Sequence, residues 1–268
     1  MRTISDLELR QLQLDILRQV HNYCQDKGLK YFLAGGTLIG AVRHKGYIPW
    51  DDDIDLFMPR KDYDLFLDYY NLQNETSTRV ISLRTRPDYY LSYAKVEDVR
   101  TELIEDVDSG CKMGVNIDLF PLDGVPDDEE ERKRYFKKIQ RLRNMETLKG
   151  VSVNWRKRNP LKNIVLIGGK ILLAPRSLRS IVESLEHAVD KTLVDTKDVA
   201  NVSSGNNGIN SCFPREAITD DIDILFEGEY FKTMQGYESY LLINYGDFMK
   251  LPPEDKRISH HAFTAYWK

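Results

Sequence analysis

Three aspartates occupy positions where they could share one catalytic site. Asp53 and Asp55 alternate with apolar residues in the segment DDDIDLFM, and Asp118 alternates in the same way in VNIDLF. Since side chains alternate along a strand, Asp53 and Asp55 are expected on one face, with Asp118 on a neighbouring strand. Carboxylates brought close together repel one another, and a hard cation such as Mg²⁺ or Mn²⁺ offsets that repulsion while leaving room for phosphate oxygens. The sequence therefore predicts Asp53, Asp55 and Asp118 as catalytic metal ligands that face a phosphate-bearing substrate.

A glycine turn upstream of this motif predicts a phosphate-binding loop. Gly35 and Gly36 end the segment KYFLAGG, whose apolar residues predict a short strand. Thr37 is expected to cap a helix that continues to about Arg43. Glycine lets the backbone approach a phosphate closely, and a helix N-terminus directs N–H groups at an anion. Donor phosphates are expected to bind at Gly35, Gly36 and Thr37.

Basic side chains between these motifs are candidates for binding the donor's diphosphate. Arg43, His44 and Lys45 lie between the glycine turn and the acidic motif, and Lys95 lies in the predicted strand YAKVED. Cations at these positions could pair with phosphate oxygens. The alternative is a solvated loop for the first three residues and a plain surface position for Lys95.

The remaining elements predict an α/β (α+β) chain. Ser5 and Glu8 form a capping box ahead of an apolar periodicity that predicts a helix as far as Lys27. Further helices are expected at 61–72, 127–149 and 176–194, and strands at 80–83, 90–96 and 115–120, the last stopped by Pro121. The order of strand, glycine turn, helix, DxD strand and later acidic strand is typical of the nucleotidyltransferase fold, with a mixed sheet at its core.

Composition narrows the class of protein. The 268 residues include 42 acidic and 38 basic side chains, so the net charge of -4 gives no indication of a nucleic-acid binder. Cys24, Cys111 and Cys212 lie far apart without the spacing of a zinc site, which favours a reduced, cytoplasmic setting. The most apolar stretch, 164–174, is shorter than the roughly 20 residues that cross a bilayer.

Longer motifs resemble a known family. The segment LAGGTLIGAVRHKGYIPWDDDIDLFMPRKDYDLF resembles the LicD family, whose relatives include fukutin-type phosphotransferases, and VNIDLFPLDG resembles that family's later motif. The C-terminal YLLINYGDFM and LPPEDKRISHH resemble its closing segment. The likeness spans nearly the whole chain and is least distinct over 127–200.

This resemblance implies a function and extends the site. It implies metal-dependent transfer of a phosphate-substituted alcohol, phosphocholine from CDP-choline, to a sugar hydroxyl of a teichoic acid or lipopolysaccharide precursor, with a lipid-linked acceptor. The family's acidic residues carry over to Asp51 as well as to the three aspartates above, and Asp52 is expected to be a hydrogen-bonding or solvated neighbour. Arg257 and His260 are added to the donor-binding residues.

Two other functions remain open at this point. A nucleotidyltransferase would use the same carboxylates to attack the α-phosphorus of an NTP and release pyrophosphate. A catalytically silent nucleotide-binding module is the third possibility, and the intact set of three acids argues against it.

Domain organisation follows from the same patterns. Residues 1–125 are expected to form the catalytic core, 126–200 a helical insertion, and 201–268 a C-terminal segment that completes the cleft. Within the insertion, basic residues of 155–182 flank the aliphatic run NIVLIGGKILLA. This pattern predicts a peripheral contact with the inner face of an anionic membrane. A helix packed inside the protein is the alternative.

Overall fold

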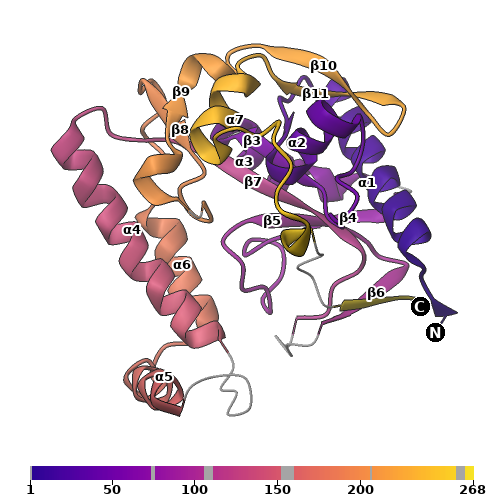
Figure 1. Cartoon of the computed structure of the whole chain (residues 1–268). Coiled ribbons are helices and arrows are strands. Elements are labelled where there is room, and N and C mark those ends of the chain that lie inside the picture. The colour runs from indigo at the N-terminus through magenta and orange to yellow at the C-terminus, as the bar shows by residue number, and fades with distance from the viewer. Residues whose placement is uncertain (1, 74–75, 106–110, 152–159, 206, 258–262) are drawn as a thin grey trace.

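A mixed sheet forms the centre of the molecule (Figure 1). The computed structural model describes residues 2–73, 76–105, 111–151, 160–205, 207–257 and 263–268. The main path of the sheet runs β2 (Phe32–Leu33), β3 (Asp55–Pro59), β7 (Asn116–Gly124), β5 (Ala94–Asp98) and β4 (Thr78–Ile81). Strands β3 and β7 are parallel, and the other pairs along this path are antiparallel. The predicted α/β class with a mixed sheet is confirmed.

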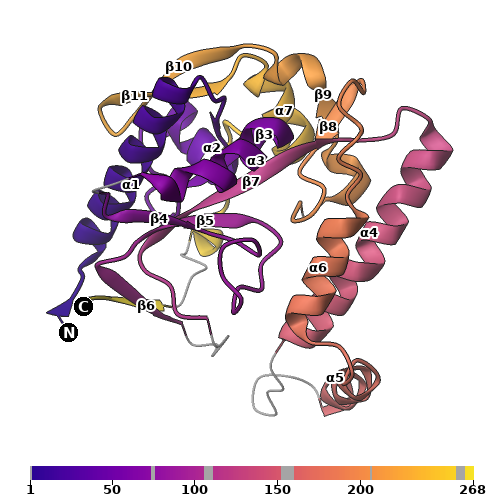
Figure 2. The same ribbon diagram turned by 180° about the vertical axis from the view of Figure 1, so that it is seen from behind.

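Two helices cover one face of this sheet (Figure 2). Helix α1 (Asp6–Lys27) begins at the predicted capping box, in which Ser5 and Glu8 each accept from the other's backbone N–H. Helix α3 (Arg60–Tyr69) is followed by the 3-10 turn η1 (Tyr70–Leu72), and α1 and α3 both contact β7. Leu56 and Met58 of β3 alternate with Asp55 and are fully buried, so Asp55 lies on the face opposite to theirs.

Helix α2 (Gly35–His44) begins two residues before the predicted cap. Its N-cap is Ala34, which makes no side-chain capping bond. Thr37 therefore does not cap the helix. It lies inside the first turn, where its Oγ1 accepts a hydrogen bond from the backbone N–H of Asp55 at 2.9 Å. Tertiary contact with β3 replaces the local capping bond that the sequence predicts.

Both acidic strands differ from their predicted bounds. Strand β3 begins at Asp55, so Asp53 precedes the strand that was expected to contain it. Strand β7 continues through Pro121 to Gly124. Pro121 pairs with Met58 of β3, whereas β5 pairs with β7 only as far as Leu119. One edge of β7 thus has no β5 partner at Pro121, and a proline is tolerated there.

The C-terminal third returns to this core. Strands β8 (Asp198–Ala200) and β9 (Phe213–Pro214) extend the sheet from β7, and β10 (Asp221–Phe226) and β11 (Glu229–Met234) form a hairpin. Helix α7 (Tyr237–Tyr245) follows. Strand β12 (Phe263–Trp267) pairs with β1 (Arg2–Thr3) and β6 (Thr101–Glu105), which brings the two ends of the chain together (Figure 1).

Three helices project beside the sheet. Helices α4 (Glu129–Gly150) and α6 (Leu178–Ala188) lie side by side, and α5 (Pro160–Leu172) lies at their far end (Figures 1 and 2). Phe136 and Ile139 of α4 share a small core with Leu185 of α6. In the part of the chain that the structure describes, every helix is too short or too polar to span a bilayer. The proposed domain boundaries stay predictions.

Candidate active site

Strand register brings two of the predicted acids together. Asp55 of β3 is the direct partner of Asp118 in the parallel pair, and Lys95 of β5 is the partner of Asp118 on its other side. Asp118 and Lys95 have side chains only 14% and 13% exposed, and they form an ion pair. The Lys95 ammonium also donates to Asn116 Oδ1 at 3.0 Å. Lys95 is therefore part of the carboxylate site and not a surface residue of a half-exposed strand.

The acidic run before β3 forms a second group. One carboxylate oxygen from each of Asp51, Asp52 and Asp53 lies within 4.8 Å of the other two, and the three residues are partly buried. Helix α1 holds their backbone, since the Arg10 guanidinium donates to Asp51 O at 2.9 Å and the Gln13 amide donates to Asp52 O at 2.7 Å. Asp52, which was expected to be a hydrogen-bonding or solvated neighbour of the ligands, belongs to this group.

These acids act on one another electrostatically. The pKa of Asp55 is raised well above its usual value, first by burial and then by the charges of Asp53, Asp118 and Asp51, while Lys95 opposes the shift. Crowded carboxylates of this kind are the donor set that a hard divalent cation prefers. The residues present therefore fit the predicted Mg²⁺ or Mn²⁺, with Asp51, Asp53, Asp55 and Asp118 as its candidate ligands.

The glycine turn lies directly against these carboxylates. A Cβ atom at Gly35 would lie 2.6 Å from Asp55 Oδ2, and one at Gly36 would collide with the Asp51 carboxylate. Gly35 also has a φ of 53°, a conformation that favours glycine. Its N–H donates to the phenol oxygen of Tyr240, a buried residue of α7, at 3.3 Å. The glycines therefore make room for the acids, and phosphate binding at this turn stays a prediction.

A cavity of about 390 Å³, here called the carboxylate cavity, opens beside Gly35 and Asp55. Most residues of its wall were not predicted from the sequence. The wall consists of a polar loop and several aromatic rings, with Asn201, Ser204, Asn207, Ser211, Phe57, Phe120, Phe213, Tyr240 and Tyr245 among its residues. The segment SSGNNG at 203–208 was the only sequence signal for this wall, and it matches no phosphate-loop motif. Its position next to Asp55 depends on the folding back of the C-terminal third.

The other predicted donor-binding residues form a separate group. The Arg43 guanidinium donates to Phe248 O at 2.9 Å and to His44 Nε2 at 2.9 Å. Burial lowers the pKa of Arg43, and the charge of Arg257 lowers it further. Arg257 lies 5.7 Å from the ring centre of Trp50. This basic cluster joins α2 to the C-terminal segment.

Two predicted residues fall outside both groups. Lys45 is the C-cap residue that follows α2, and its φ is 62°. Its carbonyl accepts a hydrogen bond from Glu227 N at 2.9 Å, beside the hairpin of β10 and β11. The Lys45 ammonium donates to Val42 O at 3.2 Å. His260 lies outside the described residues.

Fold and site together define an α/β enzyme of the nucleotidyltransferase type, and comparison with known proteins specifies the family. Residues 28–140 match the family model described as LicD/FKTN/FKRP, nucleotidyltransferase domain. The chain is 32% identical to the lipopolysaccharide cholinephosphotransferase LicD of Haemophilus influenzae over 274 aligned positions, covering 97% of this chain and 98% of that protein. The chain therefore belongs to the LicD family, and its class is that of a phosphotransferase.

Other similarities cover short segments of the chain. The ribitol 5-phosphate transferase FKRP of Homo sapiens is 49% identical over 39 residues, which is 15% of this chain and 8% of that protein. An uncharacterized protein of Rickettsia typhi is 32% identical over 69 residues, 22% of each chain. These short matches support the family and do not extend to a substrate.

Proposed function

We propose that this chain transfers phosphocholine from CDP-choline to a sugar hydroxyl of a cell-surface glycan, a lipopolysaccharide precursor or, alternatively, a teichoic acid. One observation carries the proposal: a lipopolysaccharide cholinephosphotransferase aligns with this chain along nearly the full length of both proteins. The parallel pairing of Asp55 and Asp118 beside the glycine turn supplies the site that such a reaction needs.

The reaction exchanges one phosphorus–oxygen bond for another. The acceptor hydroxyl attacks the phosphorus that carries choline, the bond to the bridging oxygen breaks, and CMP leaves as the acceptor gains a phosphodiester. Asp118 accepts the hydroxyl proton, and Lys95 holds Asp118 in place through their ion pair. A divalent cation held by Asp51, Asp53, Asp55 and Asp118 would offset the negative charge of the diphosphate.

Aromatic rings of the carboxylate cavity suit the choline head group. Tyr240 of α7 lies edge-on to Phe57 at 5.5 Å between ring centres and contacts Phe213 at 5.0 Å. Tyr245 also lines this cavity. Aromatic faces attract a quaternary ammonium through cation–π interaction, whereas an uncharged polyol such as ribitol carries no cation for this interaction. The wall of the cavity thus favours a choline-bearing donor.

Product analysis tests this proposal against the nucleotidyltransferase alternative. The protein is incubated with Mg²⁺, deacylated lipopolysaccharide oligosaccharide and either CDP-choline or a mixture of NTPs. The proposal expects CMP from CDP-choline, with the release stimulated by the oligosaccharide and with phosphocholine found on the sugar. Pyrophosphate released from an NTP, without CMP from CDP-choline, would reject it in favour of nucleotidyl transfer. If neither CMP nor pyrophosphate is released, the result would favour a silent nucleotide-binding module.

We further propose that the enzyme works at the inner face of the membrane, where a lipid-linked acceptor is found. Ile164, Val165, Ile171 and Leu172 recur on one side of α5 and are 58%, 73%, 67% and 83% exposed. An exposed aliphatic face of this size is unusual for a surface that meets only water. Of the basic residues predicted to flank it, Lys170 and Arg179 instead donate to backbone carbonyls within the protein.

A further inference from the structure

A second and larger cavity, of about 750 Å³, lies between α3, the segment 82–93 and α6. It is here called the α6 cavity. Its volume is within the range of about 300–1,000 Å³ that is usual for small-molecule sites. The proposed reaction needs two substrates, and the carboxylate cavity with its glycine turn accounts for the donor. The α6 cavity has no assigned occupant.

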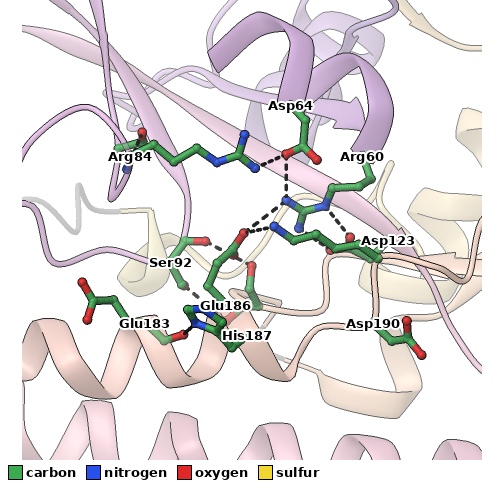
Figure 3. A network of polar contacts seen from close by, with 12 residues as sticks. Arg60, Asp64, Arg84, Ser92, Asp123, Glu183, Glu186, His187 and Asp190 are labelled. Atoms are coloured by element: carbon green, nitrogen blue, oxygen red, sulfur yellow. Dashed lines mark hydrogen bonds and ion pairs between the residues drawn. The ribbon is translucent and has the colours of Figure 1, made fainter. Parts of the chain in front are cut away.

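A buried ion pair fixes the walls of this cavity. Arg60 of α3 makes two hydrogen bonds with Asp123 of β7, at 2.6 and 2.8 Å, and its guanidinium also reaches Glu186 of α6 at 3.5 Å (Figure 3). Arg60 and Asp123 are 9% and 1% exposed, so the contact is dry. Since α3, β7 and α6 meet at one guanidinium, the cavity between them has a defined shape.

The lining combines apolar side chains with charges, most of which are paired within the protein, while Lys138 and Asp190 add one charge of each sign. Leu67, Leu83, Leu91 and Val189 contribute apolar surface. Around them Arg179 pairs with Glu183 at 2.7 Å and Lys191 pairs with Glu186 at 2.8 Å. Arg84 pairs with Asp64 (Figure 3). Paired charges offer little net attraction to a free anion. They still accept and donate hydrogen bonds to hydroxyl groups, which is the chemistry of a sugar.

His187 adds a hydrogen-bond acceptor to the rim. Its Nδ1 lies 2.6 Å from the carbonyl oxygen of Glu183, so Nδ1 must be the donor in this contact. In a neutral imidazole with this tautomer the lone pair lies on Nε2, which can accept from a hydroxyl group. The His187 side chain is exposed and lines the cavity. A sugar hydroxyl is a suitable partner for this nitrogen.

Tyr93 connects the α6 cavity with the catalytic carboxylates. Its ring lines the cavity and packs on Phe120 of the carboxylate cavity, with 4.4 Å between ring centres. The Lys95 ammonium, which pairs with Asp118, lies 5.5 Å from the centre of the same ring. The two cavities thus approach the carboxylate site at one shared boundary.

Two buried serines strengthen that boundary. Ser92, which lines the α6 cavity, donates to Ser203 O at 3.3 Å, and Ser203 donates back to Ser92 O at 3.2 Å. Ser204, the next residue, lines the carboxylate cavity. In a phosphoryl transfer the attacking oxygen of the acceptor and the leaving oxygen of the donor lie roughly in line across the phosphorus, so each substrate needs a site of its own. Two cavities that meet at one boundary beside the acids provide one site for each substrate.

We propose that the α6 cavity binds the acceptor, as a hydroxyl-rich, uncharged portion of its glycan, and that Tyr93 marks the point where the acceptor hydroxyl meets the donor. This inference rests on the proposed function for the identity of the acceptor. It adds that α3, segment 82–93 and α6 determine which sugar is accepted, while the carboxylate cavity determines the donor.

Binding without turnover tests this assignment. Deacylated lipopolysaccharide oligosaccharide is titrated into the full chain by calorimetry, with no nucleotide present. His187→Trp and Leu91→Trp each place an indole in the cavity, and both are expected to weaken binding by at least about tenfold. The matched control is Val194→Trp, at a position that is 61% exposed and does not line the cavity. It is expected to bind as the unaltered chain does.

The outcomes separate this inference from the proposed function. Weaker binding in both cavity variants, with unfolding temperatures near that of the unaltered chain, supports the α6 cavity as the acceptor site. Equal binding in all variants, or no binding by the unaltered chain, overturns it. Failure of the proposed function would appear in a different measurement, the product analysis, as the absence of CMP release from CDP-choline. Steady-state kinetics adds a second readout, since the cavity variants should raise KM for the oligosaccharide more than KM for CDP-choline.

Discussion

Asp55 and Asp118 are directly paired residues of two parallel strands, with their side chains on the polar face of the sheet. Parallel strands are joined by long connections, so this pairing brings together acids that are 63 positions apart in the sequence. Lys95 continues the row onto β5. The row is rigid because each member belongs to a hydrogen-bonded strand, and such a fixed arrangement suits the proposed metal-assisted phosphoryl transfer.

Asp55→Asn is expected to separate activity from stability. Loss of a metal-binding carboxylate removes several kcal/mol of transition-state stabilisation, which corresponds to at least about 100-fold in turnover. The free energy of unfolding should stay the same or rise, because burial and neighbouring acids raise the pKa of Asp55 and thus disfavour its charge. CMP release and urea denaturation measure the two effects. The control is Asp223→Asn, which changes an exposed acid of the hairpin formed by β10 and β11. Full turnover by Asp55→Asn at saturating Mg²⁺ would contradict the assignment of Asp55 as a metal ligand.

Gly36→Ala is expected to damage the metal site without unfolding the protein. The new Cβ would collide with the Asp51 carboxylate, while alanine is otherwise favoured over glycine in a helix by about 1 kcal/mol. Displacing a ligand by about 1 Å can cost about 100-fold in rate. Mn²⁺ titration and CMP release provide the measurements. Gly168→Ala is the control, since its Cβ would meet no atom within 4 Å. Normal Mn²⁺ affinity in Gly36→Ala would show that Asp51 is not a ligand.

Breaking the buried pair of Arg60 and Asp123 should strongly destabilise the protein. Asp123→Ala leaves a buried guanidinium without its carboxylate, and breaking such a pair costs about 3–5 kcal/mol. By contrast, Asp68→Ala removes one of the two acidic partners of Arg84, in a pair whose Asp68 and Arg84 side chains are 56% and 36% exposed, and a loss of less than about 1 kcal/mol is expected. Chemical denaturation of both variants gives the comparison. Similar losses in the two would mean that water reaches Arg60 in solution.

Stability should fall as the solution is acidified below neutral pH, partly because of His21. Its Nδ1 lies 2.6 Å from the Tyr31 hydroxyl, and burial, followed by the charge of Lys232, lowers its pKa. The unfolded chain, with a histidine pKa of about 6.5, then binds more protons than the folded chain. The stabilisation is present above that pKa and is lost as the pH falls toward the folded value.

Denaturation midpoints at pH 7.5 and pH 5.5 measure this effect. His21→Gln should show a smaller loss between the two conditions than the unaltered chain, because glutamine takes up no proton. His187→Gln, a change at an exposed histidine on α6, serves as the control. An equal loss in His21→Gln and the unaltered chain would assign the dependence to other groups.

The exposed face of α5 should bind anionic membranes. Leu172→Glu introduces a negative charge into this aliphatic face and is expected to abolish flotation with anionic liposomes at low salt. Leu7→Glu on α1 is a close control, because Leu7 and Leu172 are both 83% exposed. Its flotation should match that of the unaltered chain. If the unaltered chain itself does not float, the membrane contact is rejected.

The sequence by itself determined the features that depend on local spacing. The capping box at Ser5 and Glu8, the long charged helix after Asp128 and the alternation around Asp118 all appear in the structure as predicted. These patterns act over a few residues, through backbone hydrogen bonds and the burial of one face. Motifs over 33–66 and 115–124 were sufficient to predict the family.

Only the tertiary structure decided which residues meet. The bounds of β3 excluded Asp53, Thr37 bonded to Asp55 instead of capping α2, and Lys95 joined the acids as the partner of Asp118. The loop from Asn201 and the phenol of Tyr240 reached Gly35 and Asp55 from far along the chain. Such contacts depend on strand register and on the packing of the C-terminal third, and these are set by the burial of the whole core, because no short segment carries enough free energy to fix them alone.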